Sequence, residues 1–490
     1  MLKVSAPSPV TLGIDLGTSA VKVVALGLQG EVIGEAAAGF PTVSALPQQA
    51  EQSAADWLHA TSSAMRTLGE NLKSARGPGL EHAAAIGLTG QLPTLVCLSE
   101  GAPMAPAITW KDGRADAWAA ARVDAARRAQ MYARTGMPID GRYLAPMLKF
   151  HFADRLDEIQ SILSAKDYLL FALTGLKLTE PSTAAGYGIF DLQAHSFSES
   201  LGDFWNLPRR LLPHLKAANS LAGPLSAAGA TLLGLTAGIA VSTGAADSVC
   251  AAYRMAGLDE RVVSISFGSS AVIIGASAAA RLDPDARYLV TPHVMDGWYG
   301  REMDLLASGT GYRWLSELFG WPEGEIDRAA ARSVPGAQGL FFAPYLGGGE
   351  QGALWNSRLQ GALSGLALQH SRNDIARAYL EGVFYEVKRC VRVLAEAAPV
   401  DLVRVSGHLM HSPGSLQMLA DILDRPVAAV PDKSPAAIGA ALLAQRLLRI
   451  NGAEEGRPSP SSPCIPDRSA AQAYAALYRE YVTRAARSER

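Results

Sequence analysis

The first candidate for chemistry is an aspartate that ends an apolar, strand-like segment and is followed by a tight turn. In GIDLGTSAVKV (13–23), Asp15 precedes Gly17, which lets the backbone turn sharply. Thr18 and Ser19 then present amide and hydroxyl donors that can hold phosphate oxygens without a fixed positive charge. Asp15 can hold a magnesium ion through water, since Mg²⁺ sheds its hydration reluctantly. An ordinary Asp-x-Gly-Thr hairpin has the same residues, so both interpretations stay open.

The same pattern recurs about half a chain later. DLGTSAVKVVAL (15–26) aligns without a gap with SFGSSAVIIGAS (266–277), so that the second turn consists of Gly268, Ser269 and Ser270. This internal similarity predicts a duplicated, two-domain protein in which each half contributes one phosphate-binding turn. The alternative is a chance match between two Gly-Ser hairpins, since such turns are common.

A second aspartate, Asp247, lies in STGAADSV (242–249) among small residues that leave its carboxylate uncovered. A carboxylate in such a position can accept the proton of an attacking alcohol, which is the work of a general base in phosphoryl transfer. An N-cap aspartate gives the same pattern, because Ser248 and the apolar residues after it fit a helix start. The two roles are compatible.

Two further segments have residue types that suit a binding site. In TWKDGRADAW (109–118), Trp110, Asp112 and Arg114 alternate and would share a face of a strand or extended loop. An aromatic ring beside a carboxylate and a guanidinium suits a polyol, because it offers apolar contact for the CH groups and hydrogen bonds for the hydroxyls. The alternative is a surface ion pair beside a buried tryptophan. The glycine-rich segment 343–356, which contains Glu350, is either a functional loop or a plain connection.

The elements that must position these residues alternate between strands and helices, which predicts an α/β fold. A helix is expected over 55–72 from its 3.6-residue apolar period, and another over 373–397 with Ser371 as N-cap and Asp374 completing a capping box. A Pro/Ser-rich loop, 454–464, should precede a final helix. Strands are expected over 10–17, 22–28, 83–90, 93–99, 261–268, 271–277, 339–346 and 401–407.

Composition narrows the class of protein. With 490 residues the chain should hold two or three domains, and 44 Lys plus Arg against 46 Asp plus Glu give a net charge of -2. The chain therefore lacks the basic field of a nucleic-acid binder, and nothing indicates a membrane partner. We expect a cytoplasmic protein, because no signal peptide is evident and the cysteines are scattered as reduced thiols rather than metal or disulfide sets. These are Cys97, Cys250, Cys390 and Cys464.

Taken in order, these motifs resemble the FGGY carbohydrate kinases of the actin and hexokinase superfamily, in particular the xylulokinase-like branch. The resemblance covers about 440 residues and also rests on IGLTGQ (86–91), SAKDYLLFALTG (164–175), TEPSTAAG (179–186), APYLGGGE (343–350), HSPGSLQMLADILDRPV (411–427) and AAIGAALLA (436–444). It implies two actin-like, ribonuclease H-like α/β domains with an interdomain cleft. Residues 1–250 would form the sugar-binding domain with the catalytic aspartate, and 251–490 the nucleotide-binding domain.

The resemblance also implies roles for particular residues. Asp247 would be the general base that deprotonates the sugar hydroxyl, and Asp15 would coordinate Mg²⁺ or position the phosphates of ATP. The nucleotide would be contacted by Gly17, Thr18, Ser19, Gly268, Ser269, Ser270, Gly309 and Gly407. The sugar would lie near Gln91, Leu92, Pro93, Trp110, Asp112 and Arg114.

This sequence departs from the xylulokinase pattern at three places, so the identity of the sugar stays open. Leu92-Pro93 replaces the usual Met-His, Ser248 replaces the Asn after the catalytic aspartate, and Ser406-Gly407-His408-Leu409 replaces Gly-Gly-Gly-Ala near the adenosine site. D-xylulose is the expected substrate. The alternatives are a kinase for ribulose, glycerol or a tetritol on the same machinery and a non-catalytic ATPase of the superfamily. The oligomeric state is also open, with a homodimer as one alternative.

Overall fold

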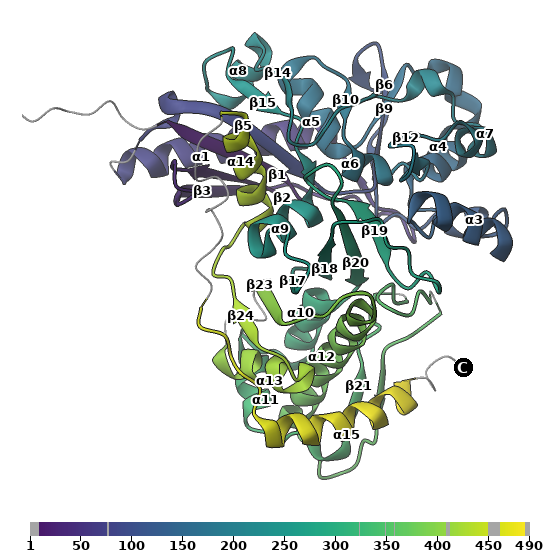
Figure 1. Ribbon diagram of the computed structural model, residues 1–490, viewed down its shortest axis with the longest axis vertical. Helices are drawn as coiled ribbons and strands as arrows, with labels where there is room; N and C mark the ends of the chain where they lie inside the picture. Colours follow the sequence, from purple (N-terminus) through teal and green to yellow (C-terminus); the bar gives the residue numbers. More distant parts are fainter. Residues whose placement is uncertain are drawn as a thin grey trace, which may run out of the picture. The chain divides into compact units, whose positions relative to one another are not determined.

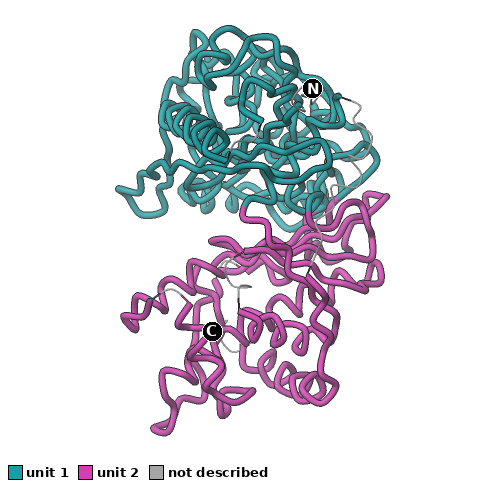
Figure 2. Tube along the Cα trace, turned by 90° about the vertical axis from the view of Figure 1, so that its left-hand side faces the viewer, with its two compact units in different colours: residues 1–254, 290–299, 434–457 teal, residues 255–289, 300–433, 458–490 magenta. Residues whose placement is uncertain are grey.

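The chain folds into two compact units, each assembled from segments that are separated in sequence (Figure 2). The computed structural model describes residues 9–75, 78–322, 324–347, 349–356, 358–407, 412–448 and 461–485. Unit 1 comprises residues 1–254, 290–299 and 434–457, and unit 2 comprises residues 255–289, 300–433 and 458–490. The predicted domain limits, 1–250 and 251–490, and the cleft between the domains stay predictions.

Unit 1 is built on a seven-stranded sheet in the order β14-β15-β5-β1-β2-β3, with β16 also paired to β5 (Figure 1). Its strands are β1 (Val10–Leu16), β2 (Ala20–Leu26), β3 (Val32–Gly39), β5 (Ala83–Gly90), β14 (Leu221–Pro224), β15 (Ala240–Ser242) and β16 (Ala245–Ala246). β1 pairs antiparallel with β2 but parallel with β5, and β16 runs parallel to β5. The carboxyl ends of β1, β5 and β16 therefore lie at one edge of the sheet, where ligands of open α/β sheets bind.

Helices α1 and α14 cover opposite faces of this sheet. Leu12 of β1 belongs to the same buried core as Trp57 of α1. The next residue, Gly13, faces α14, where a Cβ would lie only 1.9 Å from the backbone oxygen of Ala437. Because successive strand residues point to opposite faces, a glycine here lets α14 pack directly against the backbone of β1.

The remaining part of unit 1 contains helices and three small sheets, β10-β13, β11-β12 and β4-β8-β6-β7 with β9 paired to β6. The helices are α1 (Ala54–Ser74), α2 (Asp116–Ala120), α3 (Ala125–Thr135), α4 (Leu144–Phe152), α5 (Ala165–Thr174), α6 (Pro181–Ala185), α7 (Glu199–Trp205), α8 (Ala227–Leu233), α9 (Asp247–Ala256) and α14 (Pro435–Leu447). The further strands are β4 (Glu51–Gln52), β6 (Thr94–Ser99), β7 (Ala102–Pro103), β8 (Ala107–Thr109), β9 (Ser161–Leu163), β10 (Leu178–Thr179), β11 (Phe190–Asp191), β12 (Ser196–Phe197) and β13 (His214–Leu215). Strand β19 (Leu289–Pro292) is instead the edge strand of a six-stranded sheet in the order β19-β20-β18-β17-β23-β24.

Unit 2 repeats the strand arrangement that surrounds β1. Its β17 pairs antiparallel with β18 through a short turn and parallel with β23, as β1 does with β2 and β5. The two aligned sequence segments thus occupy equivalent hairpins, which supports the predicted duplication. The strands of unit 2 are β17 (Val262–Phe267), β18 (Ala271–Ser277), β20 (Tyr299–Leu305), β21 (Phe341–Ala343), β22 (Ala362–Ser364), β23 (Leu402–Gly407) and β24 (Val427–Ala429).

The long helix α12 forms the centre of the helical part of unit 2. The predicted capping box at Ser371 and Asp374 is confirmed. Glu381 and Glu386 of α12 are buried, and the hydroxyls of Tyr474 and Tyr481 on α15 donate to them at 3.0 and 2.8 Å. Buried carboxylates need such donors. The helices of unit 2 are α10 (Ser308–Phe319), α11 (Glu325–Ala331), α12 (Arg372–Ala397), α13 (Pro413–Leu423) and α15 (Arg468–Ala485).

The membrane prediction can be examined for the helices in the described ranges. None of them is both long and apolar enough to cross a membrane.

Candidate active site

The turn after β1 forms hydrogen bonds within its own hairpin and also with Trp110 and Gln52, which lie elsewhere in unit 1. The Gly17 N–H donates to the oxygen of Ala20, which closes the turn. The Thr18 hydroxyl accepts from Nε1 of Trp110 at 3.3 Å, and the Thr18 carbonyl accepts from Nε2 of Gln52 at 2.8 Å. The turn that is predicted to hold phosphate therefore contacts Trp110, which is predicted to lie near the sugar.

Asp15 is a buried carboxylate near the end of β1. Its side chain is 5 % exposed, and its Oδ1 has no hydrogen-bond partner in the described part of the chain. Burial raises its pKa, although Lys22, its partner across the hairpin, opposes this. An unpaired, buried carboxylate oxygen is costly, and a cation would satisfy it. The residues therefore fit Mg²⁺.

Water and phosphate oxygens could complete the coordination of such an ion. Across the described residues, no group of three or more His, Cys, Asp or Glu side chains is placed to hold a metal. Mg²⁺ typically uses one or two carboxylates and completes its coordination with water and substrate phosphates. Asp15 would be the protein's carboxylate, and the ion would supply charge neutralisation for the phosphates.

Asp247 emerges from the same edge of the sheet as Asp15. Thr89 of β5 pairs with Asp15 on one side and with Ala245 on the other, two residues before Asp247. Helix α9 begins at Asp247, whose Oδ1 accepts from the N–H of Ser248 at 2.8 Å, so this residue also stabilises the helix start. Parallel strands thus bring the two predicted functional carboxylates to one edge.

Gln91 lies at this edge too, and a residue that the sequence analysis missed connects it to the turn. Its N–H donates to the oxygen of Leu16, and its Nε2 donates to Oε1 of Gln52 at 2.8 Å. The same Oε1 accepts from Nε1 of Trp57. Gln52 thus joins Gln91 to Thr18, but a single glutamine on a two-residue strand leaves no signal in the sequence.

The residues after Trp110 form a turn rather than a strand, so the shared face expected for extended backbone does not position them. The Asp112 N–H donates to the oxygen of Thr109. Asp112 is 1 % exposed, and its carboxylate accepts from the N–H of Ala50 and from Arg114. Through these hydrogen bonds, the buried Asp112 holds the turn after Trp110 in place. A contact between Asp112 and a substrate stays a prediction.

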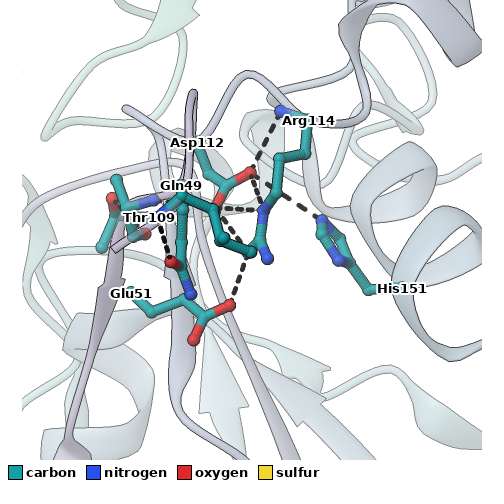
Figure 3. A network of polar contacts seen from close by, with 8 residues as sticks. Gln49, Glu51, Thr109, Asp112, Arg114 and His151 are labelled. Carbon is teal, nitrogen blue, oxygen red and sulfur yellow. Dashed lines mark hydrogen bonds and ion pairs between the residues drawn. The ribbon is translucent and has the colours of Figure 1, made fainter. Parts of the chain in front are cut away.

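Arg114 is half-buried between two carboxylates (Figure 3). Its Nη2 lies 2.6 Å from Asp112 and 2.5 Å from Glu51, and His151 lies 3.9 Å from Asp112. Burial and the Arg114 charge lower the pKa of His151. The cluster therefore has a net charge of about −1 at neutral pH, from two carboxylates, one guanidinium and a neutral imidazole. Glu51 and His151 were not foreseen.

In unit 2, five predicted nucleotide residues come together around the turn after β17. The N–H of Gly309, at the start of α10, donates to the oxygen of Gly268 at 3.2 Å, and Thr310 donates to Ser269. Gly407 pairs in register with Phe267, the last residue before the turn. Gly407 has a φ of +106°, and a Cβ there would lie 2.0 Å from the Phe267 oxygen, so a side chain does not fit. Ser270 closes the turn through its carbonyl.

The glycine-rich loop supports the same helix. The Oε1 of buried Glu350 accepts from the N–H groups of Leu306, Gln351 and Gly352, and Leu306 comes just before α10. Burial, with a contribution from Glu386, raises the pKa of Glu350 to about 8. Glu350 therefore connects the loop to the start of α10.

Two segments predicted to line the site, Leu92-Pro93 and His408-Leu409 of the altered purine segment, take no part in the hydrogen bonds described above. Leu92 and Pro93 are half-buried beside Gln91. Their side chains have no polar group to offer a sugar, unlike the His that the resemblance leads one to expect at this position. His408 and Leu409 of the altered purine segment lie outside the described residues.

The fold and the site together define a two-unit, actin-like α/β enzyme. The N-terminal domain of the FGGY family of carbohydrate kinases matches residues 10–253, and the C-terminal domain of that family matches residues 263–448. The chain therefore belongs to the FGGY family, as predicted. It is an ATP-dependent carbohydrate kinase, which transfers a phosphoryl group to an alcohol.

Several curated relatives match nearly the whole chain. The xylulose kinase of Escherichia coli K12 is 30 % identical over 442 residues, covering 89 % of each chain. The xylulose kinase of Staphylococcus epidermidis is 28 % identical over 451 residues, covering 89 % of this chain and 87 % of the relative. The gluconokinase of Bacillus subtilis is 24 % identical over 457 residues, covering 88 % and 86 %.

Solved structures confirm the predicted fold class. A kinase from Brucella ovis, described as a xyloylose kinase, superposes with a TM-score of 0.87 at 26 % identity, covering 97 % of this chain and 98 % of that one. Plasmodium falciparum glycerol kinase with ADP superposes with a TM-score of 0.85 at 18 % identity, covering 98 % of both, which shows a shared fold.

Proposed function

We propose that this kinase phosphorylates a neutral ketopentose, with D-xylulose as the leading candidate, and uses Asp247 as the general base. The observation that carries the assignment of the base is the strand register, in which β1, β5 and β16 deliver Asp15, Gln91 and Asp247 to one edge of the unit 1 sheet. The similarity to xylulose kinases over most of the chain supports the choice of sugar.

In the proposed reaction, Asp247 takes the proton of a sugar hydroxyl as its oxygen attacks the γ-phosphorus of ATP. A phosphorus–oxygen bond to the sugar forms, the bond to the bridging oxygen of the β-phosphate breaks, and ADP leaves. Unit 2 would hold the nucleotide through the turn at 268–270, Gly309 and Gly407. The turn at 17–19 would hold phosphate oxygens, and Asp15 would hold Mg²⁺.

The charges on unit 1 favour a neutral sugar over an aldonic acid. In the cluster of Figure 3, the carboxylates of Glu51 and Asp112 outnumber the guanidinium of Arg114. A substrate carboxylate near these groups would lose on the order of 1 kcal/mol or more to repulsion. Gluconate is the alternative to consider, since a gluconokinase is among the relatives.

A substrate panel tests the proposal directly. Purified protein would receive ATP, Mg²⁺ and one of D-xylulose, D-ribulose, glycerol, erythritol or D-gluconate, and the released ADP would be measured per added sugar. We expect D-xylulose to have the highest kcat/KM and gluconate to be poor. Preference for gluconate would refute the charge argument. Absence of turnover with every member would refute the assigned substrate class.

A further inference from the structure

The backbone just before Asp247 is held by buried polar side chains that lie outside the predicted nucleotide and sugar residues. We propose that Ser182 and Glu180 are positioning residues for the base Asp247, a role that rests on the function proposed above. They act through Ala246, the residue before the base. The sequence analysis noted their segment, 179–186, only as part of the family resemblance.

Ser182 makes the contact that links the two regions. It is fully buried, and its Oγ accepts from the N–H of Ala246 at 2.9 Å, although the two residues are 64 positions apart in sequence. Ala246 is also paired with Gly90 of β5. Its peptide group is therefore fixed on both sides, and α9 starts at the next residue.

Glu180 determines what the Ser182 hydroxyl can do. The hydroxyl has one proton, and it lies 2.9 and 2.8 Å from the two carboxylate oxygens of Glu180. Because that proton is donated to Glu180, the lone pairs of Oγ are left to accept from Ala246. Glu180 is itself fully buried and accepts from the N–H groups of Ser182 and Thr183 at 2.7 and 2.8 Å.

A second buried side chain holds the other end of the same segment. Nζ of Lys166 donates to the carbonyl of Thr243 at 3.0 Å and to Oδ1 of Asp167 at 2.7 Å. Between the two held ends lies Gly244, with a φ of +78°, where a Cβ would lie 1.9 Å from the oxygen of Leu88. Residues 243–246 are thus restrained at both ends and in the middle.

The cost of this arrangement argues for a role beyond folding. A buried glutamate and lysine lose their hydration, and a five-residue helix such as α6 can be capped by a small neutral residue. Instead, the buried Glu180 accepts the proton of the Ser182 hydroxyl and so leaves Oγ to accept from the peptide that precedes the base. Because a general base must lie within hydrogen-bond reach of the proton it removes, a small rotation of this peptide would misplace the Asp247 carboxylate.

The test compares Ser182→Ala with Ser182→Thr, which retains the hydroxyl. With D-xylulose and ATP, we expect Ser182→Ala to lower kcat by about 10- to 100-fold, as for a small misplacement of a catalytic group. The KM for ATP should change by less than about twofold, because no nucleotide contact is removed. Ser182→Thr should restore most of the turnover. If Ser182→Ala does not fold, Ser182→Cys removes the strong acceptor with a smaller change in shape.

Controls separate positioning from general loss of structure. Ser161→Ala removes another buried serine hydroxyl of unit 1, one without a hydrogen-bond partner among the described residues, and should leave kcat unchanged. Wild-type kcat in folded Ser182→Ala would overturn the proposal. So would a folded Ser182→Thr that is as slow as Ser182→Ala.

A double variant distinguishes this proposal from the assignment of the base. If Ser182 acts through Asp247, adding Ser182→Ala to Asp247→Ala should not lower the residual turnover further. An additional loss of the same size would overturn the positioning role. Full turnover of Asp247→Ala alone would instead refute the base, whatever Ser182 does.

Discussion

The two equivalent hairpin turns share a backbone plan but are surrounded by different groups. The first, at Gly17, follows a buried carboxylate, Asp15, and its Thr18 contacts Trp110 and Gln52. The second, at Gly268, follows Ser266 at the equivalent position and is hydrogen-bonded to the start of α10.

This difference indicates how a duplicated hairpin can acquire two roles. Near the first turn, a carboxylate and polar side chains suit a cation and a sugar. Near the second turn, the positive end of the α10 helix dipole favours an anion. The strands of both units preserve the turn, whereas the residue two positions before it and the contacts from residues distant in sequence differ.

The largest expected effect concerns Asp247, the proposed general base. Asp247→Ala should lower kcat by roughly 10³-fold, since a general base typically contributes 10²- to 10⁴-fold. Binding of ADP, measured by calorimetry, should change little because Asp247 is not among the proposed nucleotide contacts. Sugar-dependent turnover at the wild-type rate would contradict the predicted role.

The second turn depends on a buried carboxyl group that supports structure rather than chemistry. Glu350 has its pKa raised to about 8 in the folded protein, so the folded state retains a proton that the unfolded chain loses near pH 4.5. Stability is therefore fully present below about pH 4.5 and falls as the pH rises to 8, by on the order of 4 kcal/mol. Glu350→Gln should flatten this dependence in urea unfolding at pH 5, 6.5 and 8. A slope equal to that of the wild type would exclude Glu350 as its source.

Gly407 and Gly268 form a matched pair beside the second turn. Gly407→Ala should lower the free energy of unfolding by roughly 2–4 kcal/mol, because its φ of +106° and the nearby Phe267 oxygen both oppose a Cβ. It should also raise the KM for ATP. At Gly268 the nearest atom would be 3.7 Å from a Cβ, so Gly268→Ala is the control with a smaller effect on stability. Equal losses in chemical denaturation would contradict the steric argument.

Equivalent positions before the two turns allow a direct test of their divergence. Asp15→Asn should raise the Mg²⁺ concentration for half-maximal activity and lower kcat by about 10- to 30-fold, since it removes the proposed carboxylate ligand. Ser266→Ala should change either value by less than about twofold, because this position has no charge to lose. An unchanged Mg²⁺ requirement in Asp15→Asn would show that the carboxylate serves another purpose.

The smallest expected effect concerns the contact between the first turn and the sugar-side residues. Trp110→Phe retains an aromatic ring but removes the donor to Thr18, which at 3.3 Å should contribute about 0.5–1 kcal/mol. We expect a two- to fivefold rise in the KM for D-xylulose with little change in the KM for ATP. A larger effect on ATP would assign the contact to the nucleotide instead.

Local patterns in the sequence predicted most of the fold. The apolar period of α1, the capping box of α12 and the glycine-hydroxyl turns after β1 and β17 depend on neighbouring residues, and all were found where expected. The family resemblance supplied the two-domain fold, which the solved structures confirm.

Contacts between distant residues could not be predicted in this way. Gln52 reaches Gln91 across 39 positions, and Ser182 reaches Ala246 across 64. Glutamine and serine occur at many other positions of the chain, so nothing in the sequence distinguishes Gln52 or Ser182. At 110–114, the alternating residue types suggested an extended segment, but the Asp112–Thr109 hydrogen bond and the buried Asp112–Arg114 pair hold a turn.

The packing of α14 against β1 has a consequence for how the polypeptide matures. Helix α14 completes the core of unit 1, although the strands that it packs against are translated hundreds of codons earlier. Until α14 is present, the face of β1 at Gly13 has no side chain to cover its backbone. During translation, unit 1 therefore cannot complete its core until residues 434–448 have emerged from the ribosome. Chaperone dependence and sensitivity to premature termination should accordingly concentrate in the half of the enzyme that is translated first.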